Sequence, residues 1–289
     1  MMSEMHRSIQ LKANAKINIA LDVVGKREDG YHELKTLFYE TNLHDVLDFR
    51  TSDKCGIRIS CTDPTIPVDE KNIVYKAAKL LFDKYVPDAG IDIHIEKNIP
   101  HGAGLGGGSS DAAATIKAVN ELYQLKLEDH EMEAIGASLG ADVPFFISGG
   151  AAYACGIGEK LTSLKADIKM PYLIIAKPEI NVSTPEAYKL LDNEPELFHP
   201  DVDKIVKCFK AGNVRSVCKL AGNSFEKPIF KIYPQIEEIR KSFLEGGAMA
   251  SVMTGSGSAV FAFFEDEDDM KKAADNVKEK FKNVKIMIA

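Results

Sequence analysis

PHGAGLGGGSSDAA, residues 100–113, places five glycines and two serines directly before an alanine-rich segment. Glycine loses more conformational freedom on folding than any other residue, so five together need a use. The preceding IDIHIEK, residues 91–97, alternates apolar and polar residues, which is typical of a strand with one buried face. The stretch therefore predicts a strand, a glycine loop and a helix. We expect the helix to start at residues 109–111 and to bury one face, composed of Ala112, Ile116, Val119 and Tyr123.

The glycine loop fits an anion cradle better than two known nucleotide motifs. Gly102-x-Gly104-x-x-Gly107 has the letters of a dinucleotide fingerprint, but the acidic residue about twenty positions on, Glu121, falls in the predicted helix. A P-loop would need lysine where Gly108 stands. Successive N–H groups and a helix N-terminus can hold a phosphate by backbone alone. A structural turn without a ligand is the other interpretation of the loop.

The rest of the first half of the chain predicts a mixture of strands and helices. Residues 8–25 indicate a strand or strand pair, Asp29-Gly30 a turn, and residues 72–86 a helix with apolar positions at helical spacing. Further elements are expected as short strands at 45–52 and 55–61, a helix at 128–139, and a hairpin in the second half of residues 140–161.

The second half changes its order of elements. Residues 171–178 predict a strand, residues 199–245 are mostly helical, and residues 249–264 are two apolar runs about a Gly/Ser turn. A helix at 265–281 and a last strand at 283–289 follow, which gives the β-α-β-β-α-β order of a ferredoxin-like domain. We therefore expect an α+β protein with two domains, residues 1–160 and 161–289.

Composition narrows the class of protein. The 289 residues carry a formal net charge of −7 and include no apolar stretch near the ~20 residues that span a bilayer, so we expect neither a nucleic-acid nor a membrane partner. The N-terminus lacks the apolar core of a signal peptide, and the five cysteines form no CxxC pair. We expect a cytoplasmic protein with reduced thiols. The oligomeric state is not predicted.

Several motifs, in order along the chain, resemble the GHMP kinases. They are ANAKINIAL (13–21), DGYHEL (29–34), PHGAGLGGGSSDAA (100–113), GADVPFF (140–146) and TGSGSAVFAFF (254–264). Their form is most similar to the branch that phosphorylates the 2-hydroxyl of a CDP-linked methylerythritol, in the non-mevalonate (MEP) pathway of isoprenoid synthesis. The resemblance implies a first domain like domain 2 of ribosomal protein S5 and a ferredoxin-like second domain.

The same resemblance implies the residues that bind ATP. The loop would hold the triphosphate, Lys97 would reach the nucleotide, and a third motif would close toward the phosphates. The expected ATP-binding residues are Lys97, Pro100, Gly102, Gly104, Leu105, Gly106, Gly107, Gly108, Ser109, Ser110, Gly255, Ser256 and Gly257. A simple hairpin turn at residues 255–257 is the alternative interpretation of that motif.

Two catalytic residues follow from the matched motifs. Asp142 would receive the proton of the acceptor hydroxyl, because phosphoryl transfer needs positioning, charge stabilisation and a base. Lys16 would be the matching cation, since a lysine in the apolar run ANAKINIAL is costly to bury without a task. A turn aspartate and a strand lysine with its ammonium in solvent are the structural alternatives.

The expected substrate residues would recognise cytosine. Tyr31 and His32 match a pair that stacks on and hydrogen-bonds the base, and Asn18 matches a nearby polar contact. Tyr188 would lie on the other face of the base, with Thr184 near it; a loop tyrosine packed on its own domain is the alternative.

ATP implies Mg²⁺, for which the sequence offers no carboxylate cluster, and Ser109 is the nearest candidate ligand. Two other functions compete with this hypothesis. One is another GHMP small-molecule kinase of the mevalonate or homoserine type. The other is a non-catalytic nucleotide sensor or RNA-binding module, which would lack Asp142 or Lys16 and present a basic face.

Overall fold

The computed structural model describes residues 6–164 and 168–289, which form two compact units. One unit contains the described part of Met1–Ala15, with Asn42–Ile99 and Gly106–Gly149; the other contains Lys16–Thr41, Pro100–Leu105 and Gly150–Ala289. We call them unit 1 and unit 2. The division of the chain near residue 160 stays a prediction.

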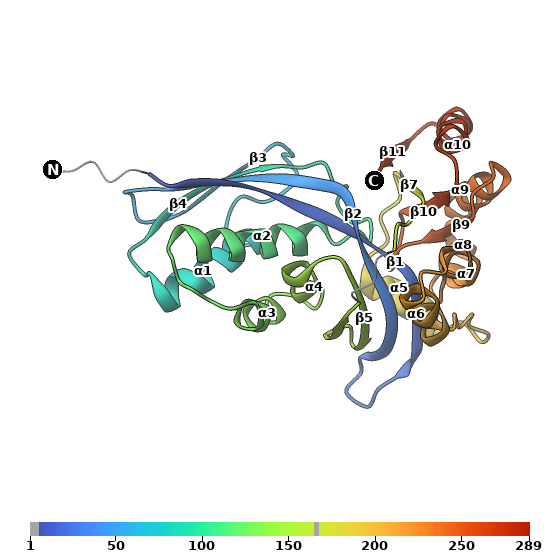
Figure 1. The fold of residues 1–289 in the computed structure, drawn as a ribbon, viewed down its shortest axis with the longest axis horizontal. Coiled ribbons are helices and arrows are strands. Elements are labelled where there is room, and N and C mark those ends of the chain that lie inside the picture. Colours follow the sequence, from blue (N-terminus) through green and yellow to red (C-terminus); the bar gives the residue numbers. More distant parts are fainter. Residues whose placement is uncertain (1–5, 165–167) are drawn as a thin grey trace. The chain divides into compact units, whose positions relative to one another are not determined.

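Unit 1 is a sheet with helices on one face. Strand β3 (Gly56–Cys61) pairs in parallel with β4 (Gly90–Glu96), and β4 pairs antiparallel with the second part of β2 (His32–Thr51). Figure 1 shows α1 (Ile73–Tyr85) and α2 (Gly107–Leu122) lying along this sheet. Ile91, Ile93 and Ile95 of β4 are buried, and His94 between them is exposed, as the alternation predicts.

Helix α2 begins earlier than the sequence predicts. Its first residue is Gly107, and the residue before it, Gly106, has left-handed backbone angles (φ 72°, ψ 14°) that glycine adopts without strain. Ser109 and Ser110 therefore lie in the first turn and do not cap the helix, so the expected start at residues 109–111 is wrong by two residues. Ala112, Ile116 and Val119 are buried as expected.

Two shorter helices complete unit 1. Helix α3 (Asp129–Ala137) was expected, whereas α4 (Val143–Ser148) was not, because its run VPFFIS has no polar spacing to mark a helix. All five side chains from Val143 to Ile147 are buried, which explains that composition.

Unit 2 contains the second part of the first strand, the first part of the second strand, and the strands that pair with them. Strand β1 (Ser8–Lys26) pairs in parallel with the short β8 (Gly222–Asn223) through Ala20 and Leu21, and the first part of β2 pairs with β5 (Ala151–Gly156). Strand β5 forms the predicted hairpin with β6 (Lys160–Ser163).

A second sheet in unit 2 has the predicted ferredoxin-like topology. Its four strands are β7 (Tyr172–Pro178), β9 (Ala250–Met253), β10 (Val260–Phe264) and β11 (Val284–Ile288). They lie in the order β11-β7-β10-β9, with every pair antiparallel. This arrangement confirms the split β-α-β-β-α-β fold expected from the sequence.

The helices of unit 2 pack around this sheet and β1. They are α5 (Thr184–Asp192), α6 (Val202–Lys210), α7 (Val214–Leu220), α8 (Glu226–Ile232), α9 (Pro234–Glu245) and α10 (Glu267–Lys280). One apolar cluster joins α5, α8, α9 and α10 to the sheet, with Phe225, Phe243, Phe264 and Ile236 at most 2% exposed. Within the described ranges, no helix is long and apolar enough to cross a membrane.

Candidate active site

The first part of the glycine loop, Pro100–Leu105, is held on two sides by backbone hydrogen bonds within unit 2. The amide of Lys16 in β1 donates to Leu105 O at 3.0 Å, and the amide of Ala259 donates to Ala103 O at 3.4 Å. The loop therefore lies between strand β1 and the turn that joins β9 to β10, which is the third motif of the sequence.

Gly104 is where these two motifs come closest. A Cβ atom built on Gly104 would lie 2.3 Å from Thr254 O, and one built on Gly255 would lie 3.1 Å from the Cα of Gly104. Gly104 also has a φ of +75°, which other residues rarely adopt. Glycine at this position allows two backbones to touch.

The second part of the loop, Gly106–Ser110 in unit 1, presents the start of α2. The amide of Ser110 donates to Gly106 O at 2.9 Å, so Gly107, Gly108 and Ser109 hold the first-turn amides that an α-helix leaves without a partner of its own. Gly108 is exposed, and a Cβ there would find only Ile73 within 4 Å, at 3.7 Å. Open donors at a helix N-terminus form a site for a phosphate.

Lys97, just after β4, forms ion pairs with two buried carboxylates in unit 1. Its ammonium, in a side chain only 8% exposed, pairs with Asp45 and with Asp111 Oδ2, the latter at 2.8 Å. Burial works against the charged lysine, but the two carboxylates outweigh it and raise the pKa of Lys97. Asp45 also accepts from the amides of Asn98 and Ile99, so this cluster fixes the end of β4 to the first turn of α2.

Asp111 is the unusual member of this cluster. Burial, against the opposing charge of Lys97 and with a contribution from the charge of Asp45, raises the pKa of Asp111 to about 7. Its Oδ1 atom is buried without a hydrogen-bond partner. The ammonium of Lys97 is thus committed to two carboxylates, and its expected contact with a nucleotide stays a prediction.

Asp142 lies at the N-terminus of α4 in unit 1, half buried, with backbone angles near helical. Its side chain makes no capping hydrogen bond to the helix. The segment before it reaches α2, because a Cβ on Gly140 would lie 3.9 Å from Ser109 Oγ. Lys117 of α2 donates to Phe146 O at 2.9 Å and so fixes α4 to the same helix. Asp142 is therefore on a rigidly held turn beside the first turn of α2.

Lys16 and Asn18 lie two residues apart on one face of β1 in unit 2. The side chain of Asn18 accepts from Lys16 Nζ at 2.8 Å and donates to Thr36 at 2.8 Å, while its own amide donates to Thr254 Oγ1 at 3.0 Å. Lys16 is 4% exposed, and its ammonium also lies over the ring of Phe38, 4.7 Å from the centroid. Asn18 thus holds the ammonium of Lys16 in place, and its expected contact with the substrate stays a prediction.

The third motif, Gly255–Gly257, is held by Asn223, a residue whose role the sequence does not indicate. The fully buried amide of Asn223 donates to Met253 O at 2.6 Å and to Gly255 O at 2.8 Å. The hydroxyls of Thr184 and Ser256 lie 3.2 Å apart, so the start of α5 contacts the same turn.

The expected cytosine residues come together at the start of β2 and on α5, all within unit 2. His32 is the first residue of β2, and its ring stacks on Tyr188 with centroids 4.5 Å apart and planes at 20°. Its Nε2 atom lies 2.6 Å from Asp192 Oδ1. Tyr31, by contrast, is 61% exposed. Tyr188 thus packs directly on His32, and its expected place on the other face of a base stays a prediction.

The expected binding of magnesium with ATP stays a prediction. No group of three or more His, Cys, Asp or Glu side chains in the described ranges is arranged to hold a metal. The hydroxyl of Ser109, in the half-exposed first turn of α2, fits a cation that takes most of its ligands from phosphate and water.

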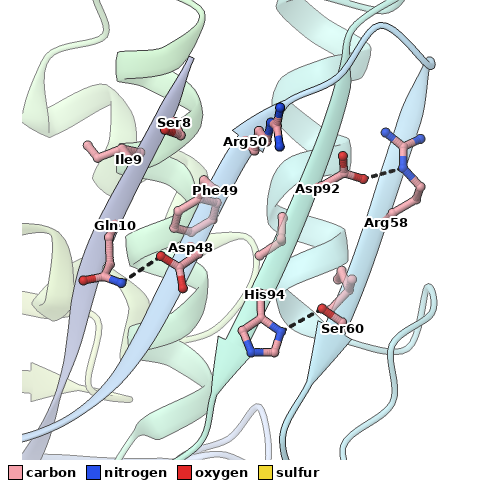
Figure 2. Close-up of a pocket in the computed structure, with 12 residues that line it drawn as sticks. Ser8, Ile9, Gln10, Asp48, Phe49, Arg50, Arg58, Ser60, Asp92 and His94 are labelled. Carbon is pink, nitrogen blue, oxygen red and sulfur yellow. Dashed lines mark hydrogen bonds and ion pairs between the residues drawn. The ribbon is translucent and has the colours of Figure 1, made fainter. Parts of the chain in front are cut away.

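A separate hollow of about 450 Å³ lies on the other face of the unit 1 sheet, away from α1 and α2 (Figure 2). Six of its polar residues form three pairs: Gln10 with Asp48 at 2.8 Å, Arg58 with Asp92 at 2.5 Å, and Ser60 with His94 at 2.8 Å. Its lining includes none of the site residues expected from the sequence.

Comparison with known proteins identifies the class. Residues 72–150 match the model of the GHMP kinases N terminal domain, and residues 205–283 match that of the GHMP kinases C terminal domain. The chain belongs to the GHMP kinase family, and that membership implies ATP-dependent phosphoryl transfer.

Individual members of the family show which kinases this chain is similar to. The 4-diphosphocytidyl-2-C-methyl-D-erythritol kinase of Clostridium novyi (strain NT) is 44% identical over 275 residues, covering 95% of this chain and 98% of that protein. A crystal structure of 4-(cytidine 5'-diphospho)-2C-methyl-D-erythritol kinase superposes with a TM-score of 0.82 at 35% identity, covering 97% and 98% of the two chains. The homoserine kinase of Cytophaga hutchinsonii shares the fold, with a TM-score of 0.78 at 22% identity and coverages of 100% and 96%.

Proposed function

We propose that this protein transfers the γ-phosphoryl group of ATP to the 2-hydroxyl of 4-diphosphocytidyl-2-C-methyl-D-erythritol, a step in the synthesis of isoprenoid precursors. The observation that carries the proposal is the glycine-rich start of α2, where Gly107, Gly108 and Ser109 present open amides. The substrate follows from the name shared by relatives that match nearly the whole chain.

The two parts of the glycine loop have different tasks in this proposal. Residues 100–105 are fixed by β1 and by the third motif, so they position the residues that follow. The amides from Gly106 to Ser110 hold the triphosphate, together with the positive end of the α2 dipole. Gly255–Gly257 lie against the first part of the loop at Gly104.

Asp142 receives the proton of the substrate hydroxyl, and Lys16 supplies positive charge at the reaction centre. Both groups are held before substrate arrives. Asp142 is on a short helix tied to α2, and the ammonium of Lys16 is fixed by Asn18. Such preorganisation is most of what an enzyme can offer phosphoryl transfer.

Tyr31, His32 and Tyr188 bind the cytosine. The exposed ring of Tyr31 offers a stacking face, and the ring of His32 offers a hydrogen-bonding edge held by Tyr188. Magnesium bound with ATP would neutralise phosphate charge, with Ser109 as its protein ligand. We place the reaction in the cytoplasm.

The proposal is tested by phosphorus NMR with ATP and Mg²⁺, run in parallel on 4-diphosphocytidyl-2-C-methyl-D-erythritol, mevalonate and homoserine. We expect a new phosphomonoester signal with the cytidyl substrate alone. Phosphorylation of mevalonate or homoserine instead would keep the family and reject the substrate. No phosphorylation of any of the three by folded, ATP-binding protein would reject the enzyme.

A further inference from the structure

Asp192, the last residue of α5, lies within hydrogen-bond distance of the His32 ring. Thr184, Tyr188 and Asp192 are four residues apart along α5 (Thr184–Asp192), so their side chains share one face of the helix. Tyr188 covers the ring of His32, and Asp192, one turn further, reaches its Nε2 atom at 2.6 Å. The side chain of His32 is 7% exposed, so its orientation is set by these two neighbours.

The charge on Asp192 determines where His32 carries its proton. Lys26 Nζ lies 2.5 Å from Asp192 Oδ2, and this hydrogen bond, with that from His32, lowers the pKa of Asp192 despite some burial. An ionised carboxylate only accepts hydrogen bonds, so Nε2 must donate. In the neutral ring Nδ1 then has a lone pair, and within the described chain no protein group hydrogen-bonds to it.

We propose that Asp192 is a positioning residue that holds His32 in the Nε2–H tautomer and thereby makes the site select cytosine over uracil. The inference rests on the proposed function, in which His32 reads the base. A lone pair at Nδ1 accepts a hydrogen bond from the exocyclic amino group of cytosine. Uracil has a carbonyl oxygen at the same position, so two acceptors would face each other and leave both unpaired.

Asp192→Asn tests this directly, because Lys26 orients the new amide. The ammonium of Lys26 needs an acceptor, so the amide oxygen turns to Lys26 and the amide NH₂ group turns to His32. Nε2 must then accept, the proton moves to Nδ1, and the edge that faces the base becomes a donor suited to uracil. Asp203→Asn is the matched control, since Asp203 pairs with Lys35 at 2.6 Å in the same unit and contacts neither His32 nor α5 in the described interactions.

The first measurement is kcat/KM for the cytidyl substrate and for its uridyl counterpart at saturating ATP. We expect the unaltered enzyme and Asp203→Asn to prefer cytidine by about a hundredfold or more. Asp192→Asn should reduce this ratio at least about tenfold without changing the KM for ATP. An unchanged ratio in Asp192→Asn overturns the inference while leaving the kinase intact. Failure of the unaltered enzyme to use the cytidyl substrate overturns the proposed function instead.

A second measurement does not depend on activity. Nitrogen-15 NMR of the seven histidines at pH 8, where an ordinary imidazole is neutral, identifies the tautomer of each ring, and the signals absent from His32→Gln assign His32. We expect the Nε2–H tautomer in the unaltered protein and the Nδ1–H tautomer in Asp192→Asn. The same tautomer in both proteins would contradict the inference.

Discussion

Gly104 and Gly108 stand four residues apart in one loop, yet their surroundings differ completely. A methyl group on Gly104 would enter the backbone of Thr254, at 2.3 Å from its carbonyl oxygen, whereas one on Gly108 would meet Ile73 at an ordinary 3.7 Å. Gly104 is needed so that two parts of the protein can touch. No close contact in the described protein requires glycine at position 108, and in the proposed function its use is to let the triphosphate approach the first turn of α2. A glycine-rich loop can therefore combine structural and binding glycines that the sequence does not distinguish.

Asp142→Asn should impair only the chemical step, so its effect is the reference for the effects of the two glycine variants. We expect Asp142→Asn to lower kcat by about 10²–10⁴-fold, the range typical of a general base, with little change in the KM for ATP. Steady-state kinetics with varied ATP measures both constants. Turnover near that of the unaltered enzyme would remove Asp142 from the mechanism.

Gly104→Ala tests the structural side of the comparison. The left-handed φ of +75° and the contact with Thr254 O together should cost about 2–4 kcal/mol of the free energy of unfolding. Urea denaturation followed by circular dichroism measures it. Should the variant stay within about 0.5 kcal/mol of the unaltered protein, the close approach of the two backbones is not needed for stability.

Asp111→Asn tests the cluster on which the second part of the loop rests. Because burial raises the pKa of Asp111 to about 7, above that of an unfolded aspartate, its contribution to stability is full below about pH 4 and is lost as the pH rises toward 7. The asparagine does not titrate. The unfolding free energy of the unaltered protein, relative to the variant, should therefore fall by roughly 1 kcal/mol for each pH unit between about 4 and 7.

Urea denaturation of both proteins at pH 5, 6, 7 and 8 measures that difference. It should level off above pH 7. A difference that grows with pH would mean that Asp111 stays ionised as an ordinary ion-pair partner of Lys97.

Gly108→Ala should have the smallest effect, and it should raise stability while it weakens the binding of ATP. Alanine suits a helix better than glycine, so stability should rise by up to about 1 kcal/mol. The methyl group would nevertheless crowd the amides of the first turn, and the KM for ATP should rise about tenfold, or about 1.4 kcal/mol. Thermal denaturation and kinetics on one preparation give both numbers. A stabilised variant with an unchanged KM for ATP would make Gly108 dispensable.

Much of this loop could be predicted from the sequence, because its signals are local. The alternation of Ile91, Ile93 and Ile95 gave β4, and the glycines and the apolar spacing that follows gave α2. The start of α2 was missed by two residues because a left-handed Gly106, and not a serine, precedes the helix. Local pattern alone does not indicate which glycine takes that conformation.

The partners of the site residues could not be predicted, because they lie far along the chain. Lys97 meets Asp45 across 52 residues, and His32 meets Asp192 across 160. One signal was available: Asp192 follows Tyr188 at helical spacing, so an aromatic residue assigned to the base also pointed to the residue one turn further. No spacing of this kind in the sequence connects Asn223 to the third motif that it holds.

The most direct test of the phosphate site is amide NMR of the glycine loop during titration with a non-hydrolysable ATP analogue and Mg²⁺. We predict the largest shifts at the amides of Gly107, Gly108 and Ser109, and a smaller one at Gly104, whose backbone lies against Thr254. Shifts that leave residues 106–110 unchanged while the analogue binds elsewhere would contradict the account.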